Sequence, residues 1–279
     1  MRNQHGHSHS RGHGDWFDMA ETLDLDALLL DDHFHRIFGW IKELCGDPHS
    51  IVDLGAGTGG GTLGLARTFP EATVVAVDQS GRMLGRLREN AEHHQLSSRV
   101  STVRADLDEE WPVLGKVDLM WAATSMHHFK DPATIFSNIR KSLAHSGVLV
   151  VVEMVALPRY LPVDLGFGVP GFEERCHSAT DRASFNAHPD WSSTLEAADF
   201  RGLAQRTFDY FQSTDQDLLA RSAVLSLARL RAHLLDGLTG EDLATLEQLL
   251  DPESERGVAR RNDLVMRGSH KVWVAGVVR

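Results

Sequence analysis

The segment from Ser50 to Met154 alternates short β-rich runs with helical runs. The β-rich runs are IVDL, TVVAVD, VSTVRAD, VDLMWAA and GVLVVVEM, and they are interspersed with TLGLARTF, RMLGRLRENAEHH and ATIFSNIRKSL, which have helical spacing. Strands that read as continuous Val and Ile runs are buried on both faces, as in a parallel sheet with helices above and below. The sequence therefore predicts a doubly wound α/β sheet.

The segments before and after this core have a different texture. Residues 1–15 are rich in His, Gly and Ser and cannot bury apolar surface, so a disordered arm is expected. Its histidines could hold a transition metal, but without packed supporting groups such a site would be loose, and no metal site is predicted. Residues 16–46 have apolar positions at helical spacing, which predicts an N-terminal helical cap of one or two helices before the core at 47–154.

The part of the chain after the core predicts a lid and a return to the sheet. Residues 155–190 contain prolines, glycines and aromatics with no clear period, which is typical of a lid or substrate-binding loop. Residues 191–279 contain the strand candidates RGLAQRTFDYF and HKVWVAGVV around a Leu-rich helical insertion at 213–255. The leucines of this insertion indicate core packing or a dimer face, so a homodimer is left open.

Composition limits the partners of the chain. Lys and Arg number 28 against 39 Asp and Glu among 279 residues, and this acidic balance argues against a nucleic-acid partner. The longest apolar run, Val148 to Val152, is too short to span a bilayer. Cys45 and Cys176 are far apart, and no apolar secretory signal is visible, so we expect a cytoplasmic protein with reduced thiols and no membrane partner.

The glycine-rich stretch IVDLGAGTGG fits two ligand-binding patterns. Gly55, Gly57 and Gly60 satisfy G-x-G-x-x-G, the pattern of dinucleotide-binding loops. Asp53 and Gly59, together with the first two of these glycines, satisfy acid-x-G-x-G-x-G. Glycine allows a strand to turn sharply into a helix and lets a ligand approach bare backbone and helix N-terminal amides. The loop alone leaves the ligand open.

Three acids favour one of these readings. Asp78 ends the second strand, where a carboxylate can accept from both hydroxyls of a ribose in any adenosine ligand. Asp53 directly precedes the glycines, where it would repel a pyrophosphate. Asp106 follows the third strand, suited to accept from an adenine amine while the amide of Leu107 donates to a ring nitrogen. Three acids at one sheet edge favour S-adenosylmethionine, a cation that carries an adenosine and no phosphate.

The motifs VDLGAGTGG, VVAVDQSGRML, RADL and MHHFKDP, followed by LAHSGVLVVVE, resemble the class I S-adenosylmethionine-dependent methyltransferases of the small-molecule type. The resemblance covers Ile51 to Glu153, with a weaker echo in WSSTLEAADF and HKVWVAGVV. It implies a mostly parallel, seven-stranded, Rossmann-like sheet with N-terminal helices and a helical or loop cap inserted late in the sheet. It also implies S-adenosyl-L-methionine as the cofactor and S-adenosyl-L-homocysteine as the product.

The resemblance places the cofactor-binding residues at the ends of the first four strands. The residues implied for the methionine half are Asp53, Gly55, Ala56 and Gly57. The residues implied for the adenosine half and its surroundings are Asp78, Gln79, Met83, Asp106, Leu107 and, beside the cofactor after the fourth strand, Ala122. For each acid the alternative is a strand-end carboxylate that caps the following helix, and Met83 could equally belong to the core.

His127 and His128, in SMHHF directly after the fourth strand, are the candidate catalytic bases. Methyl transfer depends mainly on alignment and desolvation, and a base adds to the rate if the acceptor is a hydroxyl or a protonated amine. Adjacent side chains on a loop point in different directions, so at most one of the two should reach the substrate. The stretch ATSMHHF lacks the Asn-Pro-Pro-Tyr type of loop that holds exocyclic amines, which disfavours nucleobase or glutamine methylation.

The leading interpretation is a methyltransferase that acts on an O, N or C atom of a small organic acceptor, such as a secondary metabolite. An NAD-dependent oxidoreductase is the first alternative, but it leaves Asp53 and Asp106 without a role. The second alternative is an S-adenosylmethionine-binding protein that does not transfer a methyl group. A protein or RNA methyltransferase is disfavoured by the acidic balance.

Overall fold

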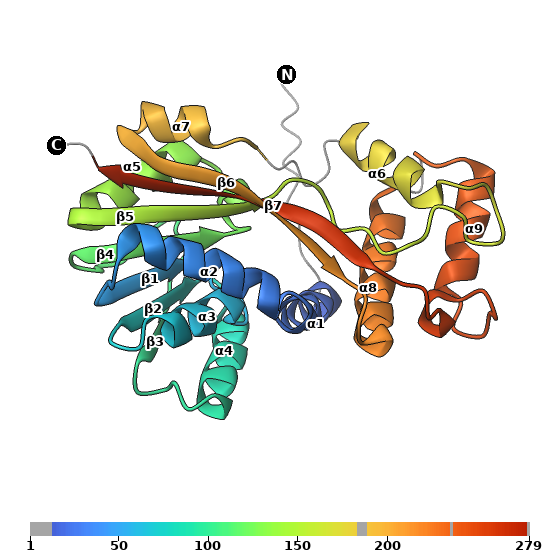
Figure 1. Cartoon of the computed structure of the whole chain (residues 1–279), viewed down its shortest axis with the longest axis horizontal. Coiled ribbons are helices and arrows are strands. Elements are labelled where there is room, and N and C mark those ends of the chain that lie inside the picture. The colour runs from blue at the N-terminus through green and yellow to red at the C-terminus, as the bar shows by residue number, and fades with distance from the viewer. Residues whose placement is uncertain (1–12, 183–188, 235–236, 278–279) are drawn as a thin grey trace, which may run out of the picture.

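A computed structural model describes residues 13–182, 189–234 and 237–277, and in these segments one seven-stranded sheet forms the centre of the molecule (Figure 1). The strand order is β3-β2-β1-β4-β5-β7-β6. The strands are β1 (Ser50–Leu54), β2 (Thr73–Asp78), β3 (Val100–Arg104), β4 (Val117–Ala123), β5 (Leu143–Met154), β6 (Phe200–Gln212) and β7 (Met266–Val277). Strands β1 to β5 pair in parallel, and β7 is antiparallel to both of its neighbours. The mostly parallel seven-stranded sheet predicted from the sequence is confirmed.

Helices cover both faces of the sheet. The helices are α1 (His13–Leu29), α2 (Asp31–Cys45), α3 (Gly60–Thr68), α4 (Gly81–His93), α5 (Pro132–Ser142), α6 (Phe172–Arg182), α7 (Ser192–Ala197), α8 (Gln216–Leu234) and α9 (Gly240–Leu250), with short 3₁₀ turns η1 (Met126–His128) and η2 (Val258–Arg260). One apolar cluster joins α2 and α3 to one face of the sheet, and another joins α5 and α7 to the opposite face. The doubly wound arrangement follows from strands that are apolar on both sides.

A third apolar cluster forms the cap, which we define as α6, α8, α9 and η2. These elements pack with the end of α1 and with the far ends of β6 and β7, which continue beyond the other strands (Figure 1). Tyr210 of β6 and Met266 of β7 are buried in this cluster. The cap therefore stands at the end of the sheet where the parallel strands terminate.

The structure changes two boundaries that the sequence predicted. Residues 1–12 of the predicted arm lie outside the described residues, but 13–15 belong to α1, so the predicted arm extended too far. The sequence predicts no regular element in the lid at 155–190, which is wrong, because α6 occupies residues 172 to 182. Helix α6 buries Phe172, Cys176 and Ala179, an i, i+4, i+7 pattern that was missed because two of its three apolar residues are small.

Contact between α2 and α3 yields a prediction. Gly64 of α3 is pressed against Phe38 of α2, and an added Cβ would lie 2.6 Å from Cζ of that ring and closer still to Cε2. The ring is only 4% exposed and is backed by Trp121, with 5.2 Å between ring centroids, so it has little room to move. We expect Gly64→Ala to lower the free energy of unfolding by about 1 to 3 kcal/mol, as overpacked cores do.

The matched control is Gly85→Ala in α4, where an added Cβ would meet only the end of Arg88 at 3.9 Å. This change should raise the free energy of unfolding slightly, by roughly 0.5 to 1 kcal/mol, because alanine favours a helix over glycine. Urea denaturation of both variants measures the difference. If both substitutions change the free energy of unfolding equally, the contact with Phe38 does not prevent a side chain at position 64.

Candidate functional site

The glycine-rich loop turns from β1 into α3 with a left-handed backbone. Gly55, Gly57 and Gly59 have φ values of +74°, +54° and +96°, which residues with a side chain rarely adopt. An added Cβ at Gly55 would lie 2.6 Å from Cβ of Ser125, and one at Gly59 would lie 2.6 Å from Cγ of Leu87. Both the conformation and the close packing therefore require glycine here.

This loop is bonded to the end of β2. The amides of Gly55 and Ala56 both donate to the carbonyl of Val77, at 2.8 and 3.0 Å. The amide of Gly57 donates to Oδ2 of Asp78 at 2.9 Å. The ends of the first two strands and the loop between them thus form one hydrogen-bonded unit.

Helix α1 packs directly on the loop. An added Cβ at Gly57 would lie 2.8 Å from Cδ1 of Leu23, and one at Gly60 would lie 3.2 Å from Cβ of Ala27. Asp24 of α1 also forms an ion pair with Arg86 of α4 at 2.9 Å. The sequence pattern predicts that a ligand approaches the backbone of these glycines. In the structure, helix α1 contacts Gly57 and Gly60.

Two acids with raised pKa values lie beside the loop. Burial raises the pKa of Asp53, which is 2% exposed, to about 7, and the nearby charge of Asp78 raises it further, against a hydrogen bond from Thr62 Oγ1 at 2.6 Å. Burial also raises the pKa of Asp78, although the amides of Ser80 and Gly57 donate to it. A positive charge bound next to these two carboxyls would favour their ionised forms.

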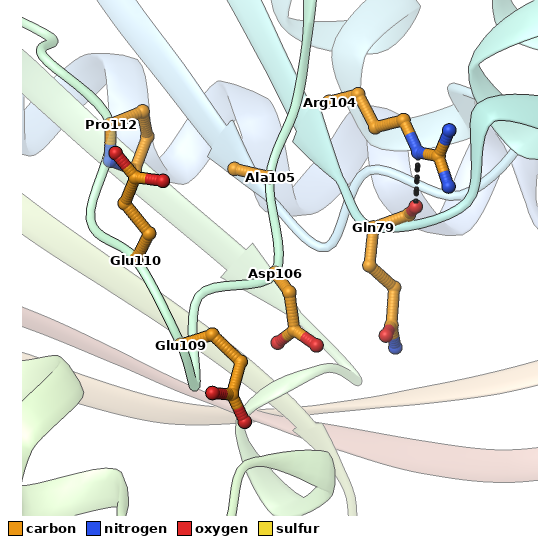
Figure 2. Close-up of a pocket in the computed structure, with 7 residues that line it drawn as sticks. All are labelled: Gln79, Arg104, Ala105, Asp106, Glu109, Glu110 and Pro112. Carbon is orange, nitrogen blue, oxygen red and sulfur yellow. Dashed lines mark hydrogen bonds between the residues drawn. The ribbon is translucent and has the colours of Figure 1, made fainter.

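A pocket of about 590 Å³ opens beside the ends of β2 and β3. Its lining residues are Gln79, Arg104, Ala105, Asp106, Glu109, Glu110 and Pro112 (Figure 2). Figure 2 shows the side chains of Gln79, Asp106 and Glu109 extending to the same side, and the Nε of Arg104 donating to the carbonyl of Gln79 at 3.0 Å. Acids outnumber the single arginine, so the pocket suits a group with hydrogen-bond donors better than a phosphate.

The structure brings together some of the predicted cofactor-binding residues and separates others. One group surrounds the glycine-rich loop and consists of Asp53, Gly55, Ala56, Gly57 and Asp78. Gln79 and Asp106 face the neighbouring pocket, and both are exposed. The side chains of Met83, Leu107 and Ala122 are instead buried, at 4%, 7% and 0% exposure.

The position predicted for Ala122 needs a correction. It was expected after the fourth strand, but β4 continues to Ala123, so Ala122 lies inside the strand. Its side chain and that of Leu107 belong to the same apolar cluster on the α5 and α7 face of the sheet. Packing within that cluster explains why a small residue, alanine, stands at position 122.

The turn after β4 is strained and firmly held. Thr124 is a β-branched residue with a φ of +48°, a conformation that persists only where the surrounding structure imposes it. Its amide donates to the carbonyl of Val152 at 2.8 Å, and the hydroxyl of Ser125 donates to the carbonyl of Leu54 at 2.8 Å. The turn that begins η1 is therefore fastened to both β5 and the start of the glycine-rich loop.

His127 and His128 have different surroundings. Nδ1 of His127 lies 2.9 Å from Oε2 of Glu153, and the two side chains are only 6% and 1% exposed. His128 is exposed, and its ring centroid lies 4.0 Å from that of His127. Sequence reasoning missed Glu153, although an acid that interrupts a fully buried strand was the signal that could have identified it.

A second buried polar group joins the N-terminal helices to the end of the sheet. Nε2 of His33 lies 2.9 Å from Nδ1 of His270, and burial and then the charge of Arg36 lower the pKa of His33 to about 4. Burial raises the pKa of Asp26 to about 7 against the charge of Arg229, and within the described residues Oδ1 of Asp26 has no hydrogen-bond partner. The contact between His33 and His270 could not be predicted, because 237 positions separate them in the sequence.

Neither a metal centre nor a membrane span is apparent in the described part of the chain. Residues 13–182, 189–234 and 237–277 contain no group of three His, Cys, Asp or Glu side chains arranged to hold a metal ion. In the same segments no helix combines the length and apolarity that crossing a bilayer requires.

Comparisons with known proteins identify the core. Residues 51–147 match a family described as a methyltransferase domain. The sequence is similar to a trans-aconitate 2-methyltransferase of Azoarcus sp. (strain BH72), with 35% identity over 105 residues, which cover 38% of this chain and 39% of that protein. It is also similar to a release factor glutamine methyltransferase of Synechocystis sp., with 55% identity over 73 residues, which cover 26% of this chain and 24% of that protein.

The fold is shared more widely than the sequence. A Bacillus halodurans protein described as a candidate methyltransferase has a similar structure, with a TM-score of 0.53 and 19% identity over 87% of this chain and 97% of that chain. Residues 51–147 are therefore a methyltransferase domain, and the sheet around them has the same fold as this solved structure. It spans less than half the length of the two curated relatives named above.

The buried carboxyl of Asp53 yields a prediction about stability and pH. Its folded pKa is about 7, above the ordinary value of an aspartate, so the folded state holds a proton that the unfolded state has lost between about pH 4 and pH 7. The free energy of unfolding should therefore fall as pH rises through this range. The slope should reach at most about 1.4 kcal/mol per pH unit.

The test compares the wild type with Asp53→Asn by urea denaturation at pH values of about 5, 6 and 7. The variant lacks this carboxyl, so the wild type should lose stability relative to the variant as pH rises. Asp26 has a raised pKa in both proteins, and its contribution cancels in the difference. If the wild type keeps or gains stability relative to the variant as pH rises, a buried and uncompensated carboxyl at Asp53 is contradicted.

Proposed function

We propose that this chain is a methyltransferase that uses S-adenosylmethionine to methylate an O, N or C atom of a small organic acceptor. The observation that carries the proposal is a pair of acids with raised pKa values, the buried Asp53 and the partly buried Asp78, beside a glycine-rich loop and next to an acid-lined pocket. A cation stabilises such acids, whereas the diphosphate of a dinucleotide would add like charge. The match of residues 51–147 to a methyltransferase domain supports the same cofactor.

The residues at the sheet edge fit the parts of this cofactor, which supplies a methyl group activated on a sulfonium. Gly55, Ala56 and Gly57 would line the methionine portion, while Asp53 would orient the loop and compensate the ammonium. Asp78 has its carboxylate at the end of β2, where it can accept from ribose hydroxyls. The neighbouring pocket, with Gln79 and Asp106, would receive the adenine.

His127 and His128 are the proposed catalytic side chains. They follow β4 in a turn that Ser125 fastens to the carbonyl of Leu54, directly before the glycine-rich loop. A methyl donor bound at the loop would therefore lie close to this turn. The turn would align the acceptor and exclude water, and a histidine could take a proton from it.

We infer that the acceptor is small and that the cap provides its surroundings. The cap stands beside the ends of the parallel strands, and its apolar cluster includes Tyr160, Phe172 and Tyr210. The stretch ATSMHHF after β4 differs from the Asn-Pro-Pro-Tyr type of loop, and the net charge of -11 disfavours nucleic acid. A cytoplasmic location and a homodimer stay as predictions from the sequence.

Analysis of the reaction product separates methyl transfer from the alternative of cofactor binding without transfer. Incubation with methyl-labelled S-adenosylmethionine and a panel of small hydroxy, amino and carboxylic acids should give a product heavier than its acceptor by one CH₂. A product of unchanged mass would support a rearrangement, and bound NAD after purification would support an oxidoreductase.

The carboxylate of Asp78 provides the direct test of the cofactor site. We expect Asp78→Ala to weaken binding of S-adenosylhomocysteine more than tenfold, about 1.4 kcal/mol or more, because the ribose loses its acceptor. Isothermal titration calorimetry measures this affinity. Asp78→Asn separates the effect of the negative charge from that of the side-chain shape. Its amide oxygen can still accept from one of the two backbone amides that donate to Asp78.

The matched control is Glu71→Ala, which removes an exposed acid just before the opposite end of the same strand, β2. Its affinity should equal that of the wild type. Circular dichroism confirms that each variant is folded. An affinity unchanged in folded Asp78→Ala would place the cofactor elsewhere.

A further inference from the structure

A buried carboxylate distinguishes the two histidines after β4. Glu153 lies near the end of β5 and is 1% exposed, and its Oε2 lies 2.9 Å from Nδ1 of His127. Its other oxygen, Oε1, accepts from the amide of Met154 at 3.2 Å, which fixes the direction of the carboxylate. His128 is exposed to solvent. The contact thus orients one imidazole of the pair.

The imidazole is also held through its backbone. The amide of Thr124 donates to β5, the hydroxyl of Ser125 donates to Leu54, and the side chain of Met126 is completely buried. These contacts fix three consecutive residues before His127 against the sheet and the glycine-rich loop. The ring therefore has a defined place at the sheet edge.

We propose that Glu153 is a positioning residue that makes His127 the general base, and that the acceptor is a hydroxyl or ammonium group that must lose a proton. This inference rests on the proposed methyl transfer and adds the class of acceptor to it. An acceptor that is already a carboxylate at neutral pH needs no base, and a buried histidine held by a carboxylate would have no task with it.

The carboxylate determines which ring nitrogen carries the proton. An ionised carboxylate only accepts, so the neutral imidazole places its proton on Nδ1, toward Glu153, and its lone pair on Nε2. Nε2 is then the atom that takes a proton from the acceptor. Once it has done so, the imidazolium is stabilised by the adjacent negative charge, as in other histidines oriented by a buried carboxylate.

The step balances in atoms and charge. The acceptor heteroatom forms a bond to the methyl carbon while the carbon–sulfur bond breaks, and that electron pair goes to sulfur. Nε2 of His127 takes the proton of the acceptor. The positive charge of the sulfonium is thereby replaced by the positive charge of the imidazolium, which lies beside Glu153. The imidazolium then returns its proton to solvent.

The first experiment reads the proton on the ring without needing the acceptor. Nitrogen-15 NMR of the histidine-labelled full chain, saturated with S-adenosylhomocysteine, should show His127 protonated on Nδ1 at neutral pH, with the signal assigned by its absence in His127→Asn. Glu153→Asp should keep this tautomer, whereas Glu153→Leu, which removes the acceptor, should shift it toward protonation on Nε2. Glu71→Gln, at the opposite sheet edge, is the control and should change nothing.

The second experiment measures rates with labelled donor and matched acceptors that carry either a hydroxyl, an amine or only a carboxylate. For hydroxyl or amine acceptors, Glu153→Gln should lower kcat by on the order of 10²-fold, the lower end of what a general base contributes, with little change in KM. Glu153→Asp should recover part of the rate. A merely structural role would change stability without this division between kcat and KM.

The outcomes separate this inference from the proposed function. An Nε2-protonated His127 in the wild type, a tautomer unaffected by Glu153→Leu, or turnover of carboxylate acceptors alone would overturn the role of Glu153 while cofactor binding and methyl transfer stand. Failure to bind S-adenosylhomocysteine would instead overturn the proposed function. If no acceptor of the panel is turned over, the tautomer of His127 in the protein decides the inference by itself.

Discussion

The hydrogen bonds between the glycine-rich loop and the end of β2 are the constraint on which the rest of the site depends. The amides of Gly55 and Ala56 share the carbonyl of Val77, and that of Gly57 is held by the carboxylate of Asp78. The loop has a left-handed backbone at three alternate positions, which glycine adopts readily. Because the loop is fixed in this way, α1 can pack over it and the turn after β4 can be fastened beside it.

The electrostatics of the sheet edge follow from burial more than from net charge. Asp53 and Asp78 lie close enough for each charge to oppose the other, and both have raised pKa values. Such an arrangement is unfavourable unless a cation is bound, which is a usual sign of a functional site. At the ends of β4 and β5, the buried acid Glu153 instead has a partner, His127, that becomes a cation when it takes up a proton.

Local pattern predicted the sheet well and the site only in part. The apolar runs around Val52, Val75 and Val150 identified their strands because strands covered by helices on both faces consist mainly of apolar residues. The pairing of His127 with Glu153 could not be read from the sequence, because 26 residues separate them and β5 must first align with β4. The glycines were recognised, but their contacts with α1 were not, since helix packing leaves no short-range signal.

The long strands β6 and β7 have a consequence for how the molecule unfolds. Strands β6 and β7 are paired from Phe200 with Val277 to Gln212 with Met266, so one ladder, with a register shift between Gly202 and Ala204, runs from the sheet into the cap. Backbone hydrogen bonds shared across that boundary oblige both regions to lose structure together. We therefore expect substitutions that loosen the helices of the cap to reduce the cooperativity with which the whole chain unfolds.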